Sequence, residues 1–125
     1  MSFEEAQIIK ERAEAFLKNV QILFEEGIYD LAAFNIEQYC QLILKYKLLI
    51  KTGTYPRTYS IIRLIKEPSK IDVRANKLLQ DIIMITKIED AYIGSRYLSR
   101  RYEKEEVETM LKYAKEIFEV FINEI

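Results

Sequence analysis

Apolar residues recur every three or four positions along almost the whole chain, and this spacing constrains the fold more than any other feature. In residues 3 to 26 the repeat places these side chains on one face of a helix: Ala6, Ile9, Ala13, Phe16, Leu17, Val20, Leu23 and Phe24. In residues 30 to 51 apolar side chains cover much of the circumference, which is typical of a central helix with several packing partners.

Only three glycines and two prolines interrupt the 125 residues, and they fall between these periodic segments. Gly27 is predicted to end the first helix in the left-handed conformation, and Asp30 favours the first turn of the second helix. The turn TGTYPR occupies residues 52 to 57. Thr58 is then expected to cap a short helix that runs to about Lys66.

The fourth predicted helix opens at Pro68 and Ser69, where Ser69 and Asp72 have the spacing of a capping box. Its expected core stripe is Ile71, Ala75, Leu78, Ile82, Ile85 and Ile88. Gly94 and Ser95 are expected to end or kink it.

The last predicted helix begins near Glu103, with acidic residues in its positive first turn. Its stripe is Val107, Met110, Leu111, Ala114, Ile117, Phe118, Phe121 and Ile122. Short turns make successive helices antiparallel neighbours. We therefore expect an all-α, up-and-down antiparallel bundle of four long helices and one short helix, forming a single domain over residues 1–125.

The composition excludes several classes of protein. The apolar runs are too short to span a bilayer, and MSFEEAQ is acidic where a secretory signal is basic, so we expect a cytoplasmic protein without membrane contact. Cys40 is the only cysteine and there is no histidine, so a buried core thiol is favoured over a nucleophile. We expect no metal and no cofactor. Abundant Ile, Lys, Glu and Tyr are also compatible with a thermophile.

Charge is segregated along the chain although the net charge is only −1. Residues 38 to 101 contain thirteen basic and five acidic side chains, whereas the flanks contain six basic and fifteen acidic ones. Such asymmetry indicates an anionic partner on one face, although oppositely charged helices that pair with each other would give the same pattern.

The stretch AYIGSRYLSRRY, residues 91 to 102, gathers three arginines and three tyrosines without an acid. A guanidinium group binds phosphate oxygens through two parallel N–H bonds, and phenol rings stack on bases. The stretch therefore favours a nucleotide or single-stranded RNA site. The competing interpretation is structural. Tyr92 and Tyr97 would then lie at the edge of the hydrophobic core, and the arginines would form ion pairs with Glu103, Glu105 and Glu106.

The segments GIYDLAAFNIEQYCQLILKYKLLIKTG, TYPRTYSIIRLI and AYIGSRY together resemble the HEPN domain family over nearly the whole chain. The resemblance assigns Glu37 and Gln38 to the family's EQ-like pair, Lys45 to its helix lysine, and Arg96 with Tyr97 to its Arg-Tyr. It implies a helical bundle that pairs two-fold. Many members are RNases of toxin–antitoxin or defence systems, and others accompany a small nucleotidyltransferase and assist nucleotide binding.

The sequence departs from the family where RNase members carry histidine. After Arg96 the histidine positions hold Arg101, Tyr102 and Glu103, and Tyr59 replaces the turn histidine. Since arginine stays protonated, general base chemistry is disfavoured. We therefore expect a non-catalytic protein that binds nucleotide or RNA phosphates beside a nucleotidyltransferase-type partner. The predicted ligand-binding residues are Lys45, Arg57, Tyr59, Arg96, Tyr97, Arg100, Arg101 and Tyr102.

Two alternatives remain open. One is a histidine-free RNase toxin that uses Arg96 with Tyr102 or Tyr59, and the other is a protein-interaction module with internally paired arginines. The surplus apolar surface of the second helix, together with the broad stripe of the last helix, also predicts a two-fold homodimer.

Overall fold

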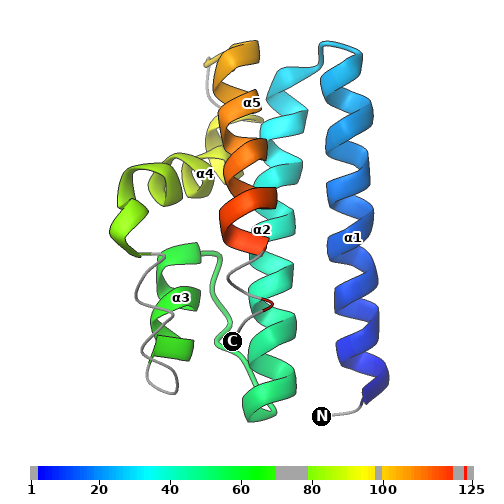
Figure 1. Ribbon diagram of the computed structural model, residues 1–125, viewed down its shortest axis with the longest axis vertical. Coiled ribbons are helices and arrows are strands. Elements are labelled where there is room, and N and C mark those ends of the chain that lie inside the picture. The colour runs from blue at the N-terminus through cyan, green and yellow to red at the C-terminus, as the bar shows by residue number, and fades with distance from the viewer. Residues whose placement is uncertain (1–2, 70–78, 98–99, 120–122, 124–125) are drawn as a thin grey trace.

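A computed structural model of the chain describes residues 3–69, 79–97, 100–119 and 123, all of which lie in helices, turns or loops (Figure 1). The helices are α1 (Phe3–Glu25), α2 (Tyr29–Thr52), α3 (Ile61–Ser69), α4 (Ile82–Gly94), α5 (Lys104–Tyr113) and a π-helical turn (Ala114–Phe118) that continues α5. The predicted all-α bundle is confirmed. Within the described residues no helix is long and apolar enough to cross a membrane.

The long α1–α2 hairpin follows the predicted boundaries closely. Gly27 has a φ of +76° and ends the turn after α1, and Gly53 has a φ of +85° and closes α2. The N–H of Gly53 donates to the carbonyl oxygen of Leu49 at 2.9 Å, which satisfies one of the last carbonyls of the helix. The two helices run side by side in opposite directions (Figure 1).

Helix α2 is the centre of the fold, as its apolar circumference predicts. It contacts α1, α3, α4 and α5, and Figure 1 shows the other helices arranged around it. Ile36, Tyr39 and Leu44 are at most 2 % exposed, and Cys40 is fully buried, as expected for a core thiol. The apolar surplus of α2 is therefore covered largely by helices of the same chain.

The start of α3 differs from the prediction that Thr58 caps it. The helix begins at Ile61, and the Oγ of Ser60 accepts the N–H of Arg63 at 3.2 Å, which makes Ser60 the capping residue. The Thr58 hydroxyl instead accepts the N–H of Ser60 at 3.1 Å. Thr58 thus shapes the turn before the helix.

The predicted opening of the fourth helix at Pro68 and Ser69 is wrong. Both residues belong to the end of α3, which finishes at Ser69, one residue after a proline that cannot donate the next helical hydrogen bond. Asp72 and the predicted core positions Ile71, Ala75 and Leu78 lie outside the described residues.

Helix α4 begins only at Ile82, and its buried stripe differs accordingly from the predicted one. Ile85 and Ile88 are 1 % exposed, as predicted, but Ile82 is 43 % exposed because it lies at the open first turn. The helix ends at Gly94, with Ser95 as its capping residue, as predicted. Figure 1 shows α4 crossing beside α2 rather than running along it.

Helix α5 begins as predicted. Glu103 precedes its first turn, and Glu103 and Glu106 form a reciprocal capping box. Five members of the predicted stripe are buried: Val107, Met110, Leu111, Ala114 and Phe118. Phe121, Ile122 and the side chain of Ile117 lie outside the described residues.

Candidate functional site

Seven of the eight predicted ligand-binding residues are divided among three places, and Arg101 lies apart from them. Lys45, Arg57 and Tyr59 line one cavity. Tyr59 also lines a second cavity, together with Arg100 and Tyr102. Arg96 and Tyr97 lie at the end of α4 and line neither cavity, and Arg101 is exposed outside both.

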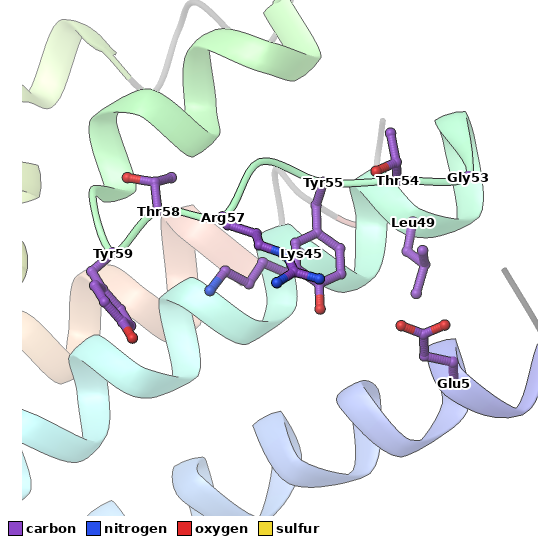
Figure 2. A pocket seen from close by; sticks show the side chains of 9 residues that line it. All are labelled: Glu5, Lys45, Leu49, Gly53, Thr54, Tyr55, Arg57, Thr58 and Tyr59. Atoms are coloured by element: carbon purple, nitrogen blue, oxygen red, sulfur yellow. The ribbon is translucent and has the colours of Figure 1, made fainter.

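The first cavity, called the cationic cavity below, has a volume of about 490 Å³. It lies between α2 and the loop that leads to α3, and its lining is Glu5, Lys45, Leu49, Gly53, Thr54, Tyr55, Arg57, Thr58 and Tyr59. Figure 2 shows the side chains of Lys45 and Arg57 extending into the space between the loop and α2, on the same side as the rings of Tyr55 and Tyr59. The carboxylate of Glu5 lies at the opposite end of the cavity, beyond Leu49 (Figure 2).

Lys45 is positioned by aromatic rings and by a polar side chain of its own helix. Its Nζ lies 5.7 Å from the ring centre of Tyr55 and 5.6 Å from that of Tyr59. It also donates to the Oε1 of Gln41 at 3.3 Å. Burial lowers the pKa of Lys45, and the nearby Glu37 carboxyl partly offsets that effect. The ammonium is thus a partly desolvated charge, which binds an anion more strongly than a fully hydrated one.

A buried carboxyl lies beneath the cationic cavity. Glu37, Gln41 and Lys45 follow one another at four-residue spacing on α2, and Glu37 is 0 % exposed. Gln38 Nε2 donates to its Oε1 at 2.8 Å, and Gln41 Nε2 donates to its Oε2. Burial raises the pKa of Glu37 from 4.5 to about 7, the two amide donors oppose the rise, and Glu89 adds to it.

Glu89 on α4 fixes the loop that carries the cavity. Its Oε1 accepts the hydroxyl of Ser60 at 2.8 Å and the backbone N–H of Ile62 at 3.2 Å. These bonds join the start of α3 to α4 and hold Tyr59 beside Tyr92, with ring centres 4.9 Å apart and planes at 23°. No sequence pattern marks Glu89 for this role, because only the fold brings it to a segment 27 to 29 positions earlier.

The second cavity, called the tyrosine cavity below, has a volume of about 720 Å³. Its wall includes the rings of Tyr59, Tyr92 and Tyr102 and the carboxylates of Glu89 and Asp90. Tyr59 is common to both cavities and separates them. The lining thus combines flat rings with hydrogen-bond acceptors.

The two cations of the tyrosine cavity are engaged by one carboxylate. Lys87 and Arg100 both pair with Oε2 of Glu106, and these contacts hold the pKa of Glu106 at about 2, with the Lys87 bond as the largest cause. The guanidinium of Arg100 also lies 3.9 Å from the ring centre of Tyr102. For Arg100 the structure therefore shows the internal ion pair that the sequence left as an alternative.

Arg96 packs against a cluster of rings. Its Cζ lies 4.2 Å from the ring centre of Phe34, 4.9 Å from that of Tyr92 and 4.7 Å from that of Tyr97. Its NH2 and Nε donate to the carbonyl oxygen of Tyr92 at 2.6 and 3.1 Å. The side chain thus caps the end of α4 while its outer surface stays exposed.

The linings of the two cavities contain cations and aromatic rings. Tyr102 is 5 % exposed and burial raises its pKa, which opposes its use as a base. Glu37 titrates near neutrality but lines neither cavity. Among the described side chains, no group of three or more Cys, Asp or Glu residues could hold a metal ion.

Residues 6–125, nearly the whole chain, match the HEPN domain family, so the chain belongs to that family. No curated protein matches the sequence. The family resemblance predicted from the order of the motifs is confirmed. The chain therefore has a helical fold that the family uses in nucleotide- and RNA-related functions.

Proposed function

We propose that this HEPN-domain protein binds nucleotide or RNA phosphates in the cationic cavity without cleaving them, and that it acts beside a small nucleotidyltransferase partner. The observation that carries the proposal is that Lys45 and Arg57 line one cavity together with two tyrosine rings (Figure 2). The partner follows from family membership alone, since other members accompany such enzymes.

The chemistry of the cavity suits a phosphate group. Arg57 offers a planar fork of N–H donors and Lys45 a compact charge, and the Thr58 hydroxyl lines the same space. The ion pairs found in the described part of the chain do not involve Arg57, and the Glu5 carboxylate of the same cavity lies at its opposite end. The excess of basic residues in the middle of the chain adds long-range attraction.

A non-catalytic role is supported by the positions of the tyrosines. The histidine-free RNase alternative needs Tyr102 or Tyr59 to remove a proton from the attacking hydroxyl. Tyr102 is buried with a raised pKa, and its neighbour Arg100 is held by Glu106. Tyr102 is thus not arranged as a base beside a free guanidinium.

Replacing Lys45 or Arg57 with glutamine is expected to weaken binding of labelled single-stranded RNA by about 1–3 kcal/mol each, the range for a lost charge-assisted contact. Binding by the original protein should also fall steeply as salt rises, because bound cations are released from the nucleic acid. A fluorescence anisotropy titration at several salt concentrations measures both effects.

Lys112→Gln is the matched control, because Lys112 is exposed on α5 and lines neither cavity. If Lys112→Gln and Lys45→Gln lose affinity equally, the loss depends only on the net charge of the protein, and this would contradict binding in the cationic cavity. Absence of binding at every salt concentration would favour the protein-interaction alternative instead.

A two-fold homodimer remains part of the proposal, but the structure changes the surface that supports it. Helix α2 is largely covered within the chain, whereas Ile83 and Ile93 on α4 are 85 % and 47 % exposed. Exposed apolar side chains of this size favour a partner surface. Light scattering at micromolar concentration is expected to give twice the chain mass, and Ile83→Lys to shift it toward the monomer.

A further inference from the structure

We infer that the two cavities on either side of Tyr59 form one nucleotide site, with the phosphate in the cationic cavity and a base that carries an exocyclic amino group in the tyrosine cavity. This inference rests on the proposed phosphate site and adds the class of base that accompanies it. The volumes of about 490 and 720 Å³ both lie in the ordinary range of small-molecule sites.

Tyr59 connects the two cavities physically. Its ring lies 5.6 Å from Lys45 Nζ, at the phosphate end, and 4.9 Å from the ring of Tyr92, in the wall of the other cavity. One face of the ring packs on Tyr92, but the side chain is 63 % exposed, so the remainder of the ring is open to a ligand. A base that stacks beside this ring would keep its phosphate within reach of Lys45.

The charges decide which end of the nucleotide enters which cavity. Glu89 and Asp90 line the tyrosine cavity, and its cations Lys87 and Arg100 are already paired with Glu106. A phosphate would be repelled there, whereas the cationic cavity presents Lys45 and Arg57, with the Glu5 carboxylate at its opposite end. The base therefore occupies the tyrosine cavity.

The same carboxylates select among bases. Glu89 uses Oε1 to bind the α3 loop, which leaves Oε2 as an acceptor, and Asp90 is exposed with no cation paired to it in the described part of the chain. Carboxylate oxygens accept from the amino group of cytosine and repel a carbonyl oxygen at the same position of uracil. The cavity thus favours the amino-bearing base of such a pair.

Calorimetric titration of the full chain with CMP, UMP and ribose 5-phosphate tests this assignment. We expect CMP to bind roughly tenfold more tightly than UMP. Asp90→Ala should abolish that preference, and Tyr59→Ala should reduce CMP to the affinity of ribose 5-phosphate, because the stacking ring is gone. Asp81→Ala is the control, an exposed carboxylate that immediately precedes α4 and lines neither cavity.

The outcomes separate this inference from the proposed function. Equal affinities for all three ligands, each weakened by Lys45→Gln, would overturn the base assignment and leave the phosphate site in place. A preference for CMP that survives both Asp90→Ala and Tyr59→Ala would overturn it as well, since the base would then lie elsewhere. Failure of all three ligands to bind would remove the phosphate site and the base site together.

Discussion

The free energy of unfolding is expected to fall by about 3 kcal/mol as the pH rises from about 5 to about 8, and a single buried carboxyl accounts for the fall. Glu37 is 0 % exposed, and its pKa is raised from 4.5 to about 7 in the folded protein. The folded protein therefore holds a proton that the unfolded chain releases earlier. The contribution of Glu37 to the free energy of unfolding is greatest below about pH 4.5 and is lost as the pH rises through about 7.

The environment of Glu37 supports this direction. Gln38 and Gln41 donate to the carboxyl, but they are neutral and compensate the buried charge only in part. Lys45 of the same helix stabilises the charged form, whereas Glu89 of α4 opposes it. The chain has no histidine, so no other side chain of ordinary pKa titrates between pH 5 and 8.

Urea denaturation of the original protein and of Glu37→Gln at closely spaced pH values measures the effect. The glutamine keeps the shape and one acceptor oxygen, so its stability should be nearly flat over the same window. Glu108→Gln is the matched control, because Glu108 is exposed on α5, and it should keep the full slope. A slope of equal size in Glu37→Gln would show that another group carries the pH dependence.

The helices could be predicted where the apolar repeat and the positions of glycine and proline indicate the same boundaries. The α1–α2 hairpin has a long three-four repeat ended by Gly27, and both helices end within one or two residues of the predicted positions. The α3–α4 boundary was missed because Pro68 and Ser69 are as compatible with a helix end as with a helix start. Only packing decides between the two, and the sequence does not show which helix Pro68 packs with.

The candidate site was predicted in composition but not in arrangement. Lys45, Arg57 and Tyr59 were named and do share a cavity, yet Tyr55 and Thr58 beside them were not. The four-residue spacing of Glu37, Gln41 and Lys45 was a visible signal of one polar stripe on an otherwise apolar helix.

The division of the arginines could not be predicted, because it depends on contacts between distant segments. Phe34 of α2 lies under Arg96, and Glu106 of α5 holds Arg100. A sequence shows that guanidinium groups are close along the chain. It does not show which of them meets a ring, a carboxylate or open solvent.

Arg96→Ala is expected to lower the free energy of unfolding by about 2 kcal/mol, combining lost cation–π contacts and charge-assisted bonds to a helix-end carbonyl. The guanidinium lies over Phe34, Tyr92 and Tyr97 and donates twice to the Tyr92 carbonyl oxygen. Because Arg96 lines neither cavity, nucleotide affinity should change much less than in Lys45→Gln. The prediction that Arg96 binds the ligand implies the opposite result: weaker binding with little change in stability.

Arg96→Lys separates the two explanations, because it keeps the charge but loses the planar fork that covers the rings. If Arg96 stabilises the end of α4 by packing, the lysine variant should be nearly as destabilised as the alanine variant, and both should bind CMP as the original protein does. If Arg96 instead contacts a phosphate, stability should be unchanged, and the alanine variant should bind CMP more weakly than the lysine variant. Thermal unfolding and CMP titration of the two variants therefore decide whether the family's Arg-Tyr pair, Arg96 and Tyr97, serves the fold or the ligand in this chain.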